Sequence, residues 1–235
     1  YIAAHDSPLF NDPRVFQKGD VVRLDLGAHV NGCVADTALT IEVATKNFND
    51  LIKASQDAVK AAIQIAKPGV QIRKIGQVVS QTITEAGFVP IVNLSGHGLD
   101  KWLVHTPPTI PNYDNGDTTL LEENQIIAIE PFASTGSGKI VEGKGSQIYG
   151  LVQEKNIRDM NARQMITFIK QEYHTLPFCS RWLIEKLGIK AKFAIKNLLD
   201  NTILHEYGVL PEKDKTSQIG QTEHTIMVGN TVTTL

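Results

Sequence analysis

The chain has 235 residues, of which 42% are hydrophobic and 20% are charged, and its formal net charge is -2. This length can bury a full core as one large domain, or as one domain with an inserted module, and the near balance of charge gives no electrostatic reason to expect nucleic acid or a membrane surface as the main partner. The two cysteines, Cys33 and Cys179, are far apart and show no C-x-x-C spacing, which favours a reducing compartment over a disulfide framework.

The chain begins with short apolar pieces that Pro8 and Pro13 interrupt, so we expect residues 1–15 to form a loop that contains His5. This start has neither the basic region nor the apolar stretch of a secretory signal peptide. No apolar run elsewhere approaches the ~20 residues that a membrane span needs. We therefore expect a soluble, cytoplasmic protein.

The alternation in residues 19–42 predicts two short strands joined at Asn31-Gly32, the dipeptide that most readily supplies the positive φ angles of a two-residue hairpin turn. With this loop, Asp25 and Asp36 are diagonal neighbours across the two strands. A loop one residue earlier would place the two carboxylates directly opposite each other. Either register puts both of them on the same face.

Two carboxylates roughly 5 to 8 Å apart on one sheet face repel each other, so a cation is normally supplied between them. The alternative is that both point into water. Val34 and Ala38 share the face of the carboxylates and make it too apolar for a fully solvated surface, while Val22, Leu24 and Leu26 occupy the opposite face. The pair is therefore expected to be half buried and to have partners.

Two helices are predicted after the hairpin. Asn49 or Asp50 can cap the first, whose apolar residues recur at helical spacing until Pro68-Gly69 stops it. The second is predicted over residues 72–86, with one apolar stripe and with Gly87 as its C-terminal stop.

Beyond the second helix the pattern changes to three strand-like pieces, over residues 88–94, 95–106 and 125–133. His97 sits between two glycines, where the backbone can pass close to another group, and His105 lies near the end of the same piece. Glu130 ends an apolar strand. Its carboxylate is either the first solvated group beyond a buried strand or a ligand directed into a site.

The hydrophobic pattern then becomes mainly helical, with three helical stretches and one extended piece, over residues 158–173, 181–187, 191–201 and 204–213. We expect residues 154–216 to form a winged-helix-like module inserted into a main domain made of residues 1–153 and 217–235. Basic residues in the module are offset by acidic and apolar ones, which disfavours DNA binding. Its expected role is to wall one side of a cleft.

The last predicted strand, residues 221–228, directs Glu223 and His224 to opposite faces, and we expect His224 to bond within the structure rather than bind a metal. The candidate ligands on separate strands are then Asp25, Asp36, His97, Glu130 and Glu223. Four carboxylates and one imidazole suit two divalent ions, and oxygen-rich ligation favours Mn, Fe, Co or Zn in a reactive site over a structural zinc. The four negative charges nearly neutralise two dications and leave a bridging hydroxide available as a nucleophile.

Several segments carry a resemblance to a known family: L-D-L-G-A-H followed by D-T-A, S-G-H-G-L-D-K-W-L-V-H, P-T-I-P-N, I-E-P-F-A-S-T-G-S-G and T-E-H-T-I. They are similar to the type 2 methionine aminopeptidases of the archaeal kind, members of the M24 or pita-bread metallopeptidase family, and the likeness extends over nearly the whole chain. It implies an α/β fold with two pseudo-twofold related halves around a curved antiparallel sheet, and two metals at its centre. It also implies that the module at 154–216 is the helical insertion of type 2 members.

By motif, the resemblance assigns Asp25 to one metal ion, Asp36 and Glu223 to both ions, and His97 with Glu130 to the other. His5 and His105 fall where the family keeps two histidines that contact the substrate. Glu130 would also carry the proton to the leaving amine.

The implied activity is the removal of the initiator methionine from nascent proteins and peptides by a cytoplasmic, monomeric enzyme, with the ribosome as a further partner. Family members usually carry roughly fifty more residues before A-A-H, helices and a strand that complete one half of the fold and part of the methionine pocket and would cover sheet edges, so we expect the sequence to be a piece of a longer chain. Two alternatives stay open. One is a proline dipeptidase of the same fold, against which the P-T-I-P-N flank and the insertion stand; the other is a non-catalytic relative that binds RNA or proteins, although such relatives typically lose ligands.

Overall fold

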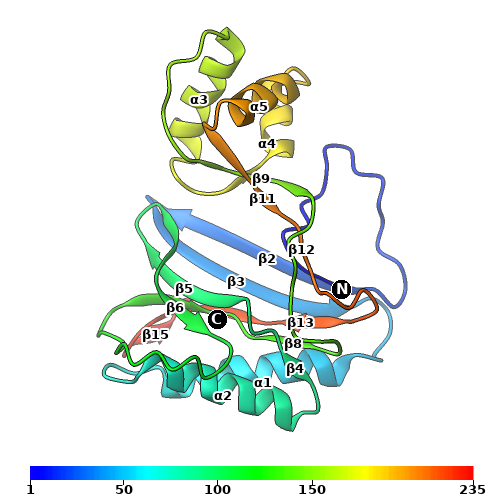
Figure 1. The fold of residues 1–235 in the computed structure, drawn as a ribbon, viewed down its shortest axis with the longest axis vertical. Coiled ribbons are helices and arrows are strands. Elements are labelled where there is room, and N and C mark those ends of the chain that lie inside the picture. The colour runs from blue at the N-terminus through cyan, green and yellow to red at the C-terminus, as the bar shows by residue number, and fades with distance from the viewer. Residues whose placement is uncertain (235) are drawn as a thin grey trace. The chain divides into compact units, whose positions relative to one another are not determined.

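The computed structural model describes residues 1–234, which divide into two compact units. The first unit comprises Tyr1, Phe16–Val141 and the chain from Pro211 onward, and the second comprises Ile2–Val15 and Glu142–Leu210. Each unit combines strands and helices, as Figure 1 shows. The two chain segments of the second unit are therefore brought together from distant parts of the sequence.

An antiparallel seven-stranded sheet is the main layer of the first unit. Its strands, in spatial order, are β2 (Val21–Val30), β3 (Cys33–Glu42), β14 (Glu223–Met227), β7 (Ile126–Ile129), β5 (Ser95–Asp100) and β6 (Leu103–Pro111), with β15 (Thr231–Val232) paired to β14. A smaller antiparallel sheet has the order β13 (Ile219–Gln221), β8 (Phe132–Ser134) and β4 (Val89–Pro90). Neighbouring strands such as β3 and β14 are remote in the chain, so the sheet can bring distant side chains together.

Helices α1 (Asn49–Ile65) and α2 (Ile72–Glu85) lie along one side of the sheets in Figure 1. The predicted stripe of α2 is fully buried, because Ile72, Ile75 and Val79 are each 0% exposed. These residues share one hydrophobic core with Ile127 and Ile129 of β7. Both predicted helices are confirmed, and their amphipathic character explains why the sheet is covered on this side.

The start of α1 differs from the prediction. Its N-cap is Phe48, without a side-chain cap hydrogen bond, rather than Asn49 or Asp50. The Glu42 carboxylate instead accepts a hydrogen bond of 2.8 Å from the Phe48 backbone N–H. A carboxylate in this position satisfies a donor at the start of the helix and is favoured by the helix dipole. The acceptor comes from the preceding strand, which is why helical periodicity did not reveal it.

The β2–β3 hairpin has the first of the two predicted registers. Asn31 and Gly32 form its loop with φ angles of 51° and 86°, and Asp25 lies opposite Ala38. Asp25 and Asp36 are therefore diagonal neighbours on one face, as the Asn-Gly turn predicts.

The opposite face of the hairpin is apolar. Leu24, Leu26 and Leu39 lie on it and are 54%, 47% and 48% exposed. In contrast, the Asp36 side chain is only 15% exposed. The Asp36 carboxylate is thus largely buried, as predicted. Asp25 on the same face is exposed, because β2 is the edge strand of the sheet, so the prediction of a half-buried pair is correct for Asp36 and wrong for Asp25.

One predicted strand is two strands in the structure, because residues 95–106 turn at Lys101-Trp102 between β5 and β6. Trp102 has a φ of 62°, and its backbone N–H donates to the Gly32 carbonyl at 2.8 Å. A Cβ on Gly32 would lie 2.4 Å from the Trp102 indole Nε1. The turn thus depends on a contact with a distant segment, which alternation along 95–106 cannot reveal.

The second unit has a hydrophobic core of its own. Its helices α3 (Met160–Glu172), α4 (Ser180–Leu187) and α5 (Ala191–Asp200) correspond to the three predicted helical stretches, with α4 beginning one residue earlier than predicted. Its sheet has the antiparallel order β10 (Phe178–Cys179), β9 (Gly145–Leu151) and β11 (Leu204–Gly208). The short strands β1 (Ile2–Ala4) and β12 (Leu210–Pro211) pair with each other, and Pro211 is assigned to the first unit. Asp159 caps α3 by accepting a 2.7 Å hydrogen bond from the Ala162 N–H.

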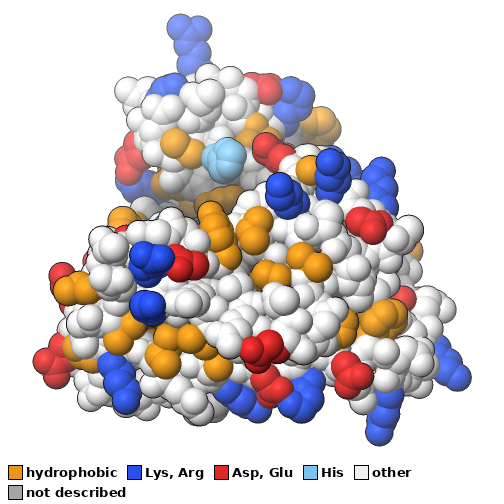
Figure 2. Space-filling view, turned by 60° about the horizontal axis from the view of Figure 1, so that its bottom comes forward, with side chains coloured by type: hydrophobic (Ala, Val, Ile, Leu, Met, Phe, Trp, Pro, Cys, Tyr) orange, Lys and Arg blue, Asp and Glu red, His pale blue; other side chains and the backbone are white. Residues whose placement is uncertain are grey.

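The surface in Figure 2 carries acidic and basic side chains interspersed, in keeping with the net charge of -2. Such a face offers no single-sign field to attract nucleic acid. Among the described helices, none has the length and apolar character needed to cross a membrane.

Candidate metal centre

The main sheet places the five predicted ligands on neighbouring strands. They are Asp25 on β2, Asp36 on β3, Glu223 on β14, Glu130 directly after β7, and His97 on β5. The spatial order of these strands is also β2, β3, β14, β7 and β5. Each strand therefore contributes one group, and all five groups belong to the first unit.

Asp36, His97 and Glu223 form the tightest cluster, in which one potential ligand atom of each lies within 4.8 Å of the others. His97 Nε2 is 3.9 Å from Asp36 Oδ2 and 3.8 Å from Glu130 Oε1. Two ligands of one first-row ion, each at roughly 2.0 to 2.2 Å from it, are no more than about 4.4 Å apart. His97 is therefore close enough to Asp36, and close enough to Glu130, to share an ion with each of them.

His97 has the tautomer that a metal ligand needs. Its Nδ1 lies 3.1 Å from the Gly98 carbonyl oxygen, which can only accept, so Nδ1 carries the proton and donates it. Burial lowers the pKa of His97, partly offset by this hydrogen bond. The neutral ring then presents the Nε2 lone pair towards the carboxylates, as in ligating histidines that donate their other ring N–H to a backbone carbonyl.

The glycines on either side of His97 allow the strands to approach closely. A Cβ on Gly96 would lie 2.2 Å from the Ala128 carbonyl oxygen, and one on Gly98 would lie 2.2 Å from the Pro107 carbonyl oxygen. The backbone of β5 at His97 therefore passes close to the backbones of the adjoining strands β7 and β6. Their close approach holds His97 between two neighbouring strands.

The carboxylates of the cluster resist ionisation. Burial, and then the negative charge of Asp25, raises the pKa of Asp36 to about 6. Burial also raises the pKa of Glu130 and of Glu223 well above the usual range, and the neighbouring carboxylates add to both shifts. Crowded, buried carboxylates of this kind favour either protons or a cation among them.

The chemistry of the donor set fits divalent metal ions. Buried carboxylate oxygens with one imidazole nitrogen suit Mn, Fe, Co or Zn. Bound cations would relieve the mutual repulsion that raises the pKa values of Asp36, Glu130 and Glu223. The Glu130 side chain is 14% exposed and faces His97. Of the two alternatives for this carboxylate, the solvated group beyond a buried strand is therefore wrong.

Two residues of the site were missed from the sequence. Gln221 donates from Nε2 to Asp25 Oδ2 at 3.0 Å and lies 3.4 Å from Glu130 Oε2. The Thr225 hydroxyl accepts from the Asp36 backbone N–H at 2.7 Å and donates to the Asp36 carbonyl at 2.8 Å. Both residues lie two positions from Glu223, so the period of two along a strand is the signal that could have found them.

His105 lies beside this cluster, with its ring centroid 4.5 Å from that of His97 in an edge-to-face arrangement of 79°. Its backbone has a φ of 63°. His224 has the expected direction away from the cluster, since its Nδ1 lies 3.0 Å from the Thr234 hydroxyl. The structure therefore brings His105, but not His224, to the predicted ligands.

His5 belongs to the second unit. Its Nδ1 donates to the Gly208 carbonyl oxygen at 2.9 Å, and its ring centroid is 5.6 Å from that of Tyr207. These contacts hold the ring against β11. Its predicted role at the substrate stays a prediction.

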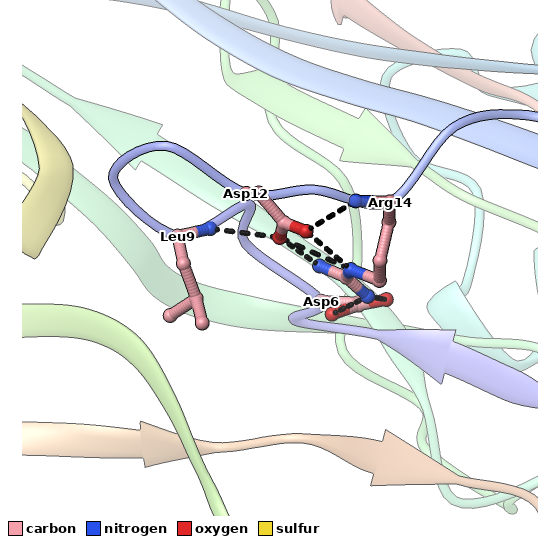
Figure 3. A network of polar contacts seen from close by, with 4 residues as sticks. All are labelled: Asp6, Leu9, Asp12 and Arg14. Carbon is pink, nitrogen blue, oxygen red and sulfur yellow. Dashed lines mark hydrogen bonds and ion pairs between the residues drawn. The ribbon is translucent and has the colours of Figure 1, made fainter.

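The loop after His5 is closed by Arg14, which Figure 3 shows between two carboxylates. Its guanidinium donates to Asp6 at 2.9 Å and to Asp12 at 2.8 Å. Asp12 also accepts from the Leu9 backbone N–H at 3.0 Å, and the hydrogen bonds from Arg14 hold the pKa of Asp12 well below its usual range. One cation thus fixes the shape of this loop.

Comparison with known proteins gives a consistent result. Residues 2–158 match metallopeptidase family M24. The chain is 41% identical over 235 residues to the methionine aminopeptidase of Archaeoglobus fulgidus, covering 99% of this chain and 78% of that protein. It is 39% identical over 229 residues to the methionine aminopeptidase of Pyrococcus horikoshii, covering 97% of this chain and 77% of that protein.

Solved structures share the fold at lower sequence identity. A thermophilic Arx1 superposes with a TM-score of 0.81 at 18% identity, covering 97% of this chain and 70% of that one. Methionine aminopeptidase from Thermotoga maritima superposes with a TM-score of 0.60 at 23% identity, covering 92% of this chain and 63% of that one.

Proposed function

The chain belongs to metallopeptidase family M24, and within it to the methionine aminopeptidases; from that membership we propose which of its residues carry out the reaction. The protein is a methionyl aminopeptidase, a hydrolase whose substrates are proteins with an N-terminal methionine. The observation that carries this conclusion is the 41% identity to an archaeal methionine aminopeptidase over 235 residues. The fold is the pita-bread fold of the family, with a curled antiparallel sheet.

Membership of M24 implies metal ions, and we propose two divalent ions of Mn, Fe, Co or Zn. Asp25 would hold one ion, Asp36 and Glu223 would bridge both, and His97 with Glu130 would hold the other. When bound, the ions supply Lewis acidity that activates water and polarises the scissile carbonyl. The clustering of Asp36, His97 and Glu223 within 4.8 Å supports this proposal.

The remaining roles concern the substrate and the proton. Binding of the free α-amino group at the centre would fix the position of the first peptide bond, which makes the enzyme an exopeptidase. His105, beside His97, would donate a hydrogen bond to the carbonyl oxygen as negative charge develops on it. His5 would bond the scissile amide or the backbone of the next residue. Glu130, buried next to His97, would carry the proton to the leaving amine.

We further propose that residues 154–216 are the winged-helix-like insertion of the type 2 enzymes, within a main domain of residues 1–153 and 217–235. Three helices and a separate hydrophobic core support this, although the middle strand β9 (Gly145–Leu151) of the three-stranded sheet precedes residue 154. The proposed setting is the cytoplasm, where a monomer would act on nascent chains close to the ribosome.

The test is the release of free methionine from Met-Gly-Met by the protein loaded with Co²⁺ or Mn²⁺, with Ala-Pro as the competing substrate. We expect cleavage of the methionyl peptide, loss of activity after chelation, and little cleavage of Ala-Pro. Asp36→Asn should abolish the activity, whereas a matched change on an exposed helix face, Lys53→Gln, should leave it intact. Cleavage of Ala-Pro alone would identify a proline dipeptidase, and no cleavage of either would point to a non-catalytic relative.

A further inference from the structure

Gln221 occupies an unusual place, because its side-chain amide lies between two carboxylates of the site. The residue is 1% exposed, and its Nε2 is 3.0 Å from Asp25 Oδ2 and 3.4 Å from Glu130 Oε2. An amide nitrogen has two hydrogens, so it can donate one to each carboxylate. The two carboxylates come from different strands, β2 and the end of β7.

The backbone of Gln221 is held firmly by a single buried hydroxyl. Its N–H donates to the Thr40 Oγ1 at 2.8 Å, and its carbonyl accepts from the same Oγ1 at 2.7 Å. Thr40 is 5% exposed. The side chain that carries the amide therefore extends towards the carboxylates from a backbone position fixed by two hydrogen bonds.

The residue type at this position matters. A lysine here would place a cation where metal ions must bind, and a glutamate would add another negative charge to a crowded group. A neutral amide can donate to both carboxylates without competing for their charge. Glutamine thus orients the carboxylates and leaves their negative charge for a metal.

The geometry around Glu130 shows the consequence of this orientation. Its Oε2 lies towards Gln221, while its Oε1 lies 3.8 Å from His97 Nε2, on the side of the three-residue cluster. One oxygen is thus used for positioning and the other is left for ligation. Asp25 likewise uses its Oδ2 to accept a hydrogen bond from Gln221.

We propose that Gln221 is a positioning residue that links the two ion sites, by holding one oxygen each of Asp25 and Glu130. The proposal rests on the proposed function, in which these two carboxylates belong to different ions. Loss of the amide should therefore release the two carboxylates from each other and weaken the binding of both ions. Removing an outer-shell partner of a metal ligand typically costs about 10- to 100-fold in metal affinity.

The experiment is a calorimetric titration of the chelator-stripped protein with Co²⁺, followed by its d–d absorption spectrum. The variant is Gln221→Met, which keeps the length of the side chain and removes both donors. We expect the wild-type protein to bind two ions, and the variant to bind both about 10- to 100-fold more weakly with an altered spectrum. Gln221→Asn keeps the amide but shortens its reach, and should show the same loss; it carries the test if Gln221→Met does not fold.

Ser55→Ala is the matched control. It removes the 2.8 Å hydrogen bond between the buried Ser55 and Thr222 hydroxyls, next to Gln221 in the chain, without touching a carboxylate of the site. This control should lose stability but keep both ions and the wild-type spectrum. Unchanged affinities and spectrum in the folded Gln221 variants, or an equal loss in Ser55→Ala, would overturn the proposal. A wild-type protein that binds fewer than two ions, or that fails to release methionine, would instead count against the proposed function.

Discussion

Replacing Asp36 by asparagine should stabilise the metal-free protein, even though it removes a proposed metal ligand. Burial and the charge of Asp25 raise the pKa of Asp36 from 3.8 to about 6. A carboxyl whose pKa is raised on folding binds more protons in the folded state than in the unfolded state, so it lowers the free energy of unfolding as the pH rises through this window. Asparagine has nearly the same shape and carries no charge at any of these pH values.

The expected gain can be worked from the pKa shift. A difference of about two pH units, at about 1.4 kcal/mol each, corresponds to about 3 kcal/mol for Asp36 above pH 6. Between pH 5 and pH 7 the advantage of Asp36→Asn should grow by about 1 kcal/mol. The charge of Asp36 also raises the pKa values of Glu130 and Glu223. Removing that charge lessens the repulsion on both carboxylates, which adds to the expected gain in stability.

The assay is urea unfolding in the presence of a chelator at pH 5, 6 and 7. Trp102 belongs to the first unit and Trp182 to the second, so a Trp182→Phe background lets tryptophan fluorescence report the unit that holds the site. Comparison of Asp36→Asn with its parent cancels the opposite contribution of the distant His224, whose pKa burial lowers. An asparagine variant that is less stable than its parent at pH 7, or whose advantage shrinks as the pH rises, would refute the reasoning.

Three further changes test other parts of the account. His105→Ala should keep both metal ions but lower kcat by about 100- to 1,000-fold if the ring stabilises the oxyanion; metal analysis with steady-state kinetics checks this, and unchanged turnover would remove His105 from the mechanism. Gly32→Ala should destabilise the first unit by more than about 1 kcal/mol, because its φ is 86° and the new Cβ would lie 2.4 Å from Trp102 Nε1; unfolding followed by Trp102 fluorescence measures it, and a neutral effect would contradict the close contact. Arg14→Ala should loosen the loop that follows His5 and raise KM for Met-Gly-Met with unchanged Co²⁺ affinity, since both carboxylates that hold Arg14 lie within that loop; an unchanged KM would separate the loop from substrate binding.

Local patterns in the sequence predicted much of the first unit. Asn31-Gly32 identified the hairpin and its register, because few other dipeptides adopt two successive positive φ angles. The apolar stripe of α2 is likewise buried as its spacing indicates. In both cases the determining interaction lies within a few residues along the chain.

The missed features depend on contacts between distant segments. The turn at Trp102 forms against Gly32, and the start of α1 uses a carboxylate from the preceding strand. Alternation and helical periodicity describe a single helix or strand, so they cannot reveal contacts with residues that are distant in the sequence.

The site was predicted from motifs, whereas its supporting residues were not. Gln221 and Thr225 are ordinary polar residues of a strand until β13 and β14 place them next to Asp25 and Asp36. The raised pKa values also follow from burial in the folded sheet. The residue types that meet at the cluster can thus be predicted from the sequence, but their orientation is a property of the assembled strands.

The central claim is that these five groups hold two metal ions. Anomalous X-ray diffraction from crystals soaked in Mn²⁺ tests it most directly. The account predicts two peaks about 3.5 to 4 Å apart, with Asp36 and Glu223 touching both, Asp25 touching one, and His97 with Glu130 touching the other. A single peak, or peaks held by other residues, would contradict it.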